Sequence, residues 1–124
     1  MTKNTESDSE RLRQFILTGI EEKKGQQIVI IDLEKINNSV CDFFIISHAD
    51  SGIQVKAIAQ NIEEKVKKGL NEKAYHREGY ENAQWILLDY HSVVVHIFQK
   101  EIRDHYRLEE LWADGTISQP GKEE

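Results

Sequence analysis

Cysteine, proline and long hydrophobic runs are scarce or missing in this chain of 124 residues. The one cysteine, Cys41, excludes an internal disulfide bond and is typical of a protein kept in a reducing cytoplasm. No apolar run approaches the roughly 18 residues of a membrane-spanning helix, and the polar first residues, MTKNTESDSER, have no apolar signal core. We therefore expect a cytoplasmic protein that has no membrane partner.

Basic residues are also in deficit, with 16 against 22 acidic residues and a formal net charge of −6. This charge balance argues against nonspecific binding of nucleic acid, because such binding depends on lysine and arginine side chains that neutralise phosphates. It favours a basic protein as partner. We expect no direct sequence-specific binding of nucleic acid.

The chain length allows one domain with one hydrophobic core. We expect residues 1–7 to form a flexible lead-in, residues 8–114 a single α/β domain, and residues 115–124, which contain the only proline, a disordered tail. The predicted fold is a mixed sheet of about five strands with flanking helices. Hydrophobic periodicity predicts, in order, a helix from about residue 8 to Gly25, strands over 27–33 and 42–47, a helix over 51–69, a strand over 73–77, a hairpin, and short helices with a kink near Arg107.

The helix over 51–69 has the clearest signals. Ser51 and Gln54 have the spacing of a capping box, in which a serine side chain accepts a hydrogen bond at the start of a helix. Gly69 is predicted to end this helix. The apolar side of the helix carries Val55, Ile58, Ala59, Ile62 and Val66.

Two apolar, β-branched runs predict a β-hairpin. The runs 85–90 and 93–98 are separated only by His91 and Ser92, and a two-residue loop fixes the register so that Tyr90 pairs with Val93. Side chains alternate between the two faces of a strand. The face expected to lie in the core carries Ile86, Leu88, Val93, Val95 and Ile97.

The second face of the hairpin is mostly apolar too, but it also holds polar side chains. A hairpin that is apolar on both faces is either buried on both or presents one of them to a partner. The tryptophan on this face is therefore either a sheet residue covered by a helix or an interface anchor. The aspartate either serves the turn or pairs with a basic residue of a partner. The candidate protein-binding residues are Trp85, Leu87, Asp89, Val94, His96 and Phe98, with Glu78 at the edge before the hairpin.

The ordered series of motifs over roughly residues 19–112 resembles the ribosomal silencing factor family, also called the Iojap family. The matching segments are DFFIIS at 42–47, QVKAIA at 54–59, WILLDY at 85–90, VVVHIF at 93–98, Arg103, Tyr106 and LEELW at 108–112. The turn at His91 and Ser92 departs from the pattern, because relatives usually carry a glycine there. A type I′ turn requires positive φ at both central positions.

The resemblance implies a topology similar to that of nucleotidyltransferases, but without enzymatic activity and without a cofactor. It implies docking on the large ribosomal subunit, on large-subunit ribosomal protein fourteen. The bound protein would then sterically block the small subunit and lower translation when nutrients are scarce. Ribosomal proteins are typically basic, which suits an acidic partner. The same apolar face would also allow a homodimer when no ribosome is present.

A second hypothesis is a metal-dependent, nucleotidyltransferase-like enzyme. Asp32 and Glu34 place two carboxylates on one face at a strand end, and such enzymes hold Mg²⁺ with a pair of this kind. The plainer interpretation is a strand that runs out into solvent, and the Gly-Ser turn that these enzymes use against nucleotide phosphates is missing. The five histidines do not have metal-ligand spacing, so we expect no metal site.

Overall fold

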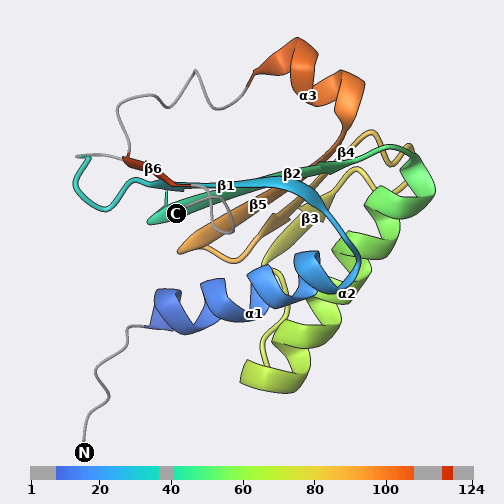
Figure 1. Ribbon diagram of the computed structural model, residues 1–124. Coiled ribbons are helices and arrows are strands. Elements are labelled where there is room, and N and C mark those ends of the chain that lie inside the picture. The colour runs from blue at the N-terminus through green and yellow to red at the C-terminus, as the bar shows by residue number, and fades with distance from the viewer. Residues whose placement is uncertain (1–7, 37–40, 108–115, 119–124) are drawn as a thin grey trace, which may run out of the picture.

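The computed structural model describes residues 8–36, 41–107 and 116–118, and its centre is one twisted sheet (Figure 1). In chain order its elements are α1 (Asp8–Glu22), β1 (Gln26–Asp32), β2 (Phe43–Ala49), α2 (Gly52–Leu70), β3 (His76–Glu78), β4 (Trp85–Asp89), β5 (Val93–Gln99), α3 (Lys100–Tyr106) and β6 (Thr116–Ser118). Helices α1 and α2 cover one face of the sheet, and α3 lies on the other side (Figure 1). None of the helices in this described part is both long and apolar enough to cross a membrane.

The sheet has six strands in the order β3-β4-β5-β2-β1-β6. Its two central strands, β2 and β5, are parallel, and the other neighbouring pairs are antiparallel. Parallel neighbours need a crossover connection, and here α2 forms the main part of it. The mixed α/β sheet with flanking helices expected from the sequence is thus confirmed, with one short strand added at the β1 edge.

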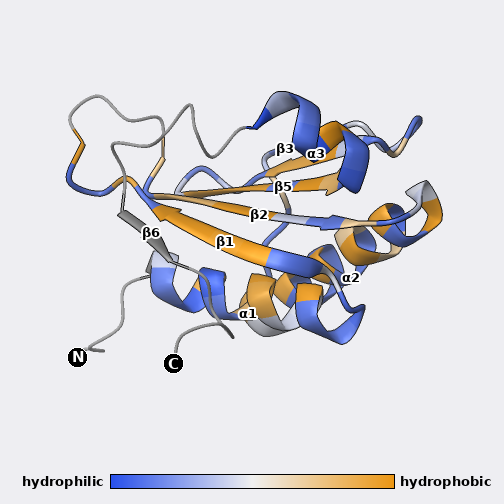
Figure 2. Ribbon diagram, turned by 45° about the horizontal axis from the view of Figure 1, so that its top comes forward, coloured by the Kyte–Doolittle hydropathy of each residue, from blue (hydrophilic) through white to orange (hydrophobic). Residues whose placement is uncertain are grey.

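The predicted division of the hairpin into two faces is also confirmed. Leu88 lies opposite Val95, and Ile86 lies opposite Ile97, as the two-residue loop requires. All five side chains of the predicted core face are fully buried, and they form one cluster with the apolar sides of α1 and α2. Figure 2 shows hydrophobic residues concentrated along the central strands. Burial of each such side chain stabilises the fold by roughly 1.5–3 kcal/mol.

Helix α2 begins as the sequence predicts but ends later. The Ser51 hydroxyl accepts a hydrogen bond from the Gln54 amide at 3.2 Å. The helix passes through Gly69 and ends at Leu70, where it is capped by Asn71 with a left-handed φ of 57°. Gly69 instead lets α1 approach α2, because a Cβ atom there would lie 2.4 Å from the Phe15 ring. The expected stop at Gly69 is therefore wrong, because packing between helices explains this glycine.

The hairpin turn differs from a type I′ turn. His91 has φ of 74°, and it is the one turn residue with positive φ. The Ser92 amide donates to the Tyr90 carbonyl at 2.9 Å, which closes a γ-turn around His91. The Asp89 carboxylate accepts from the His91 amide at 2.8 Å. A side-chain hydrogen bond thus stabilises a turn that lacks glycine.

Strand boundaries at both edges of the sheet differ from expectation. The strand predicted over 73–77 is shorter and later, because β3 covers only His76–Glu78, and its residues are all exposed. Strand β6 pairs with β1 inside the segment expected to be a disordered tail. The expected lead-in, the helix after Arg107 and the rest of the tail lie outside the described residues.

Gly79 is a point where the fold tolerates no side chain. Its φ is +93°, and a Cβ atom would lie 2.0 Å from the carbonyl oxygen of Trp85. We expect Gly79→Ala to lower the free energy of unfolding by about 2 kcal/mol, because it combines backbone strain with overpacking. Urea denaturation measures this change. Gly52→Ala is the matched control, because its closest contact would be 3.1 Å to a flexible side chain. Equal unfolding midpoints for the two variants would contradict the prediction.

Candidate functional site

The candidate site lies on the side of β4 and β5 opposite α1 and α2, and we call it the β4–β5 face. The register brings its members together in cross-strand pairs: Trp85 with Phe98, Leu87 with His96, and Asp89 with Val94. Neighbouring strand β2 adds Phe44 and Ile46 to the same apolar cluster. The structure thus groups the six hairpin residues predicted from the sequence.

Burial divides the β4–β5 face into an open half and a covered half. Trp85, Leu87 and Asp89 on β4 are half-buried. On β5, His96 is 5% exposed and Phe98 is fully buried. The covered residues are in no position to touch a partner directly in this conformation, so they support the open half from beneath. The residues of β4 and their exposed neighbours are the ones that a partner can reach.

Trp85 lies in a cluster of aromatic rings. Its ring centroid is 4.9 Å from that of Phe98, 5.0 Å from that of Tyr106 and 5.9 Å from that of His96. Its indole Nε1 donates a hydrogen bond to Nδ1 of His96 at 3.1 Å. The tryptophan is therefore held in one orientation by stacking and by a hydrogen bond, although part of it remains open to solvent.

Tyr106 is a neighbour of the site that is not among the binding residues predicted from the sequence. It is 51% exposed and stands at the end of α3, against Trp85. The spacing between Ile102 and Tyr106 indicates the helix but does not reveal which strand it packs on. Tyrosine is enriched at interface hot spots, so Tyr106 extends the reachable part of the face.

Arg103 fixes α3 to the sheet. It is 6% exposed, and its Nη1 donates to the Gln27 carbonyl and to Nδ1 of His48, both at 2.8 Å. Burial and the nearby Arg103 charge lower the pKa of His48, which keeps its ring neutral and able to accept. These contacts tie the helix that carries Tyr106 to strands far away in the sequence.

The two candidate carboxylates of the site, those of Asp89 and Glu78, have different hydrogen-bond partners. Asp89 is used by the hairpin turn, where it accepts the His91 amide, so the turn interpretation of this residue is supported. Glu78 lies on the exposed edge strand β3, next to β4, and pairs with His76 at 2.9 Å. Both add negative charge beside the open half of the β4–β5 face.

The Asp32 and Glu34 pair is also explained by local structure. The Asp32 carboxylate accepts from the Glu34 amide at 2.9 Å, as in an Asx-turn. Partial desolvation, followed by the charges of Asp32 and Asp42, raises the pKa of Glu34. Within residues 8–36, 41–107 and 116–118, no group of three or more histidine, cysteine, aspartate or glutamate side chains is placed to hold a metal ion. The Asx-turn gives this pair a local structural role.

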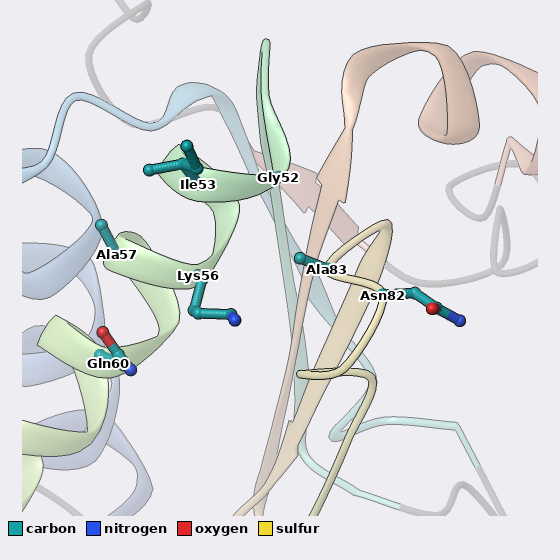
Figure 3. Close-up of a pocket in the computed structure, with 7 residues that line it drawn as sticks. All are labelled: Gly52, Ile53, Lys56, Ala57, Gln60, Asn82 and Ala83. Carbon is teal, nitrogen blue, oxygen red and sulfur yellow. The ribbon is translucent and has the colours of Figure 1, made fainter.

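A cavity of about 410 Å³ lies elsewhere, between the first turns of α2 and the loop before β4 (Figure 3). Lys56 extends into the gap, while Ile53 lies at its upper rim and Asn82 points away from the helix (Figure 3). Lys56 is the one ionisable side chain among the described residues that line the cavity. The cavity shares no lining residue with the β4–β5 face, so the two are separate features of the fold.

Comparisons with known proteins agree with the motif series. A family model described as "Ribosomal silencing factor during starvation" matches residues 6–124. A ribosomal silencing factor of Halalkalibacterium halodurans is 39% identical over 106 residues, which are 86% of this chain and 89% of that protein. One of Bacillus subtilis is 38% identical over 99 residues, 79% of this chain and 81% of that protein. A crystal structure from Chromobacterium violaceum has a TM-score of 0.80 at 31% identity, covering 86% of this chain and 88% of that one. The chain belongs to the ribosomal silencing factor family.

Proposed function

We propose that this protein binds the large ribosomal subunit through the β4–β5 face and thereby prevents the small subunit from joining. The observation that carries the proposal is the family match over residues 6–124. The contacted component would be large-subunit ribosomal protein fourteen, which the motif series implies. The protein would then act in the cytoplasm, as a translation repressor and without catalysing a reaction.

The chemistry of the face supports a role in protein binding. Trp85, Leu87 and Tyr106 offer half-buried or exposed apolar area in one place. Tryptophan and tyrosine anchors commonly contribute most of the binding free energy of an interface. Val94, His96 and Phe98 are buried and lie beneath these side chains.

Charge supports a basic partner. The chain has a formal net charge of −6, and Asp89 and Glu78 lie beside the apolar anchors. A negative rim around an apolar centre steers a positively charged partner toward the face and suppresses acidic ones. Lysine and arginine side chains of a ribosomal protein would meet this rim.

Occupancy alone is sufficient for the proposed mechanism. A stable complex of standard size buries about 800 Å² on each partner. A folded domain fixed at the subunit interface fills space that the small subunit needs. The same face would pair two copies of the chain when ribosomes are absent, so homodimer and ribosome would compete for it.

Subunit joining gives a direct test of the proposed function. Purified large and small subunits are mixed at a magnesium concentration that favours joining, and light scattering follows the formation of whole ribosomes. We expect preincubation of large subunits with the protein to reduce the scattering amplitude, and preincubation of small subunits to leave the rate unchanged at early times. An unchanged amplitude in both arms would contradict the proposal.

A further inference from the structure

His96 occupies a buried position directly beneath the proposed anchor. It is 5% exposed, and its ring packs edge-on against Phe44, with centroids 5.1 Å apart and planes at 86°. On another side it lies nearly parallel to Phe98 at 6.2 Å. The imidazole is thus enclosed by aromatic rings and is out of reach of a docking partner.

The hydrogen bond between Trp85 and His96 requires one protonation state. The indole Nε1 is only a donor, so Nδ1 of His96 must accept at 3.1 Å and the proton must sit on Nε2. Desolvation lowers the pKa of His96 to about 4, so the ring remains neutral near neutral pH. The acceptor is therefore always available to Trp85 under those conditions.

We propose that His96 is a positioning residue for docking, which acts on the partner only through the orientation that it imposes on Trp85. This inference rests on the proposed function. A tryptophan free to sample several rotamers loses that freedom on binding, whereas a tryptophan already fixed by a buried acceptor does not. His96 therefore makes the anchor preorganised in the free protein.

The Nε2 atom of His96 strengthens this interpretation. It is buried and finds no hydrogen-bond partner among the described residues. An unsatisfied buried N–H group is destabilising, so packing alone does not explain a histidine at this position, where an apolar side chain would avoid the penalty. The bond to Trp85 is the polar contact that the imidazole does make.

The test compares two substitutions at the same site. His96→Leu replaces the imidazole with an apolar side chain of similar size and removes the acceptor. His96→Asn returns an acceptor oxygen to the place of Nδ1, one bond from Cγ. We expect His96→Leu to weaken binding to isolated large subunits by roughly threefold to tenfold, and His96→Asn to recover most of that loss. Circular dichroism verifies that both variants are folded.

A second readout follows Trp85 itself. The chain has two tryptophans, so ¹⁵N-labelled protein shows two indole N–H resonances, and Trp85→Phe identifies the one from Trp85. We expect His96→Leu to shift this resonance and accelerate its exchange with solvent, and His96→Asn to reverse both changes. Val95→Ala is the matched control, because it opens a cavity on the opposite face of β5 and should leave the resonance and the binding unaffected.

The outcomes separate the inference from the function on which it rests. If wild-type protein binds and His96→Leu binds equally well, the positioning role is wrong and the proposed function stands. If His96→Leu and Val95→Ala weaken binding alike, general loss of stability explains the effect and the positioning role is again wrong. If the wild type binds no subunit, the proposed function fails, and the docking role of His96 fails with it.

Discussion

Trp85→Ala is expected to weaken binding to the large subunit by about 2 kcal/mol or more, close to a thirtyfold loss of affinity, while the fold is retained. The substitution removes a half-buried aromatic anchor that packs against Phe98 and Tyr106. Trp85 packs on the smaller apolar cluster that contains Phe98, whereas the main apolar cluster lies on the other face of the sheet and does not contain Trp85. Titration of labelled protein with isolated large subunits measures the effect.

Ile53→Ala is the control for loss of exposed apolar area. Ile53 is 86% exposed and lies on α2, which covers the opposite side of the sheet. We expect this variant to bind like the wild type. If Trp85→Ala unfolds by circular dichroism, Trp85 belongs to the core and is no anchor. If it is folded and binds normally, the interface lies elsewhere.

Stability is expected to fall by about 2 kcal/mol between pH 7 and pH 5 because of His96 alone. Burial lowers its folded-state pKa from the ordinary 6.5 to about 4. Between these values the unfolded chain binds a proton that the folded protein does not, so acid favours unfolding. The full contribution, about 3 kcal/mol at 1.36 kcal/mol per pKa unit, is present above pH 6.5 and is lost as the pH falls to 4.

Urea denaturation across this pH range measures the effect. His96→Asn removes the titrating group, so its stability should depend less steeply on pH than that of the wild type. A residual slope should remain, because the pKa of buried His48 is also lowered. Identical slopes for the wild type and His96→Asn would show that His96 does not carry a lowered pKa.

The hairpin was predictable because its information is local. A two-residue loop and a period of two determine which side chain faces which way, so His91 and Ser92 were enough to place Trp85, Leu87 and Asp89 together. The turn itself did not need glycine, because the Asp89 carboxylate supports the positive φ of His91.

Features that depend on distant contacts were not predictable in the same way. Gly69 resembled a helix end because its contact with Phe15 of α1 is invisible in the local pattern. The position of Tyr106 depends on Arg103, which reaches Gln27 from 76 residues away. Strand β6 covers 3 residues, which is too short for a recognisable periodicity, and its pairing with β1 depends on the folded chain. The aromatic cluster around Trp85 therefore forms through contacts that the local sequence pattern does not reveal.

Co-sedimentation tests the central claim most directly. The purified protein is centrifuged with isolated large subunits, isolated small subunits and joined ribosomes, and the pellets are assayed for the chain. The account predicts pelleting with large subunits and absence from small subunits and joined ribosomes, because the bound protein and the small subunit compete for one space. Equal pelleting with joined ribosomes, or no pelleting with any particle, would contradict it.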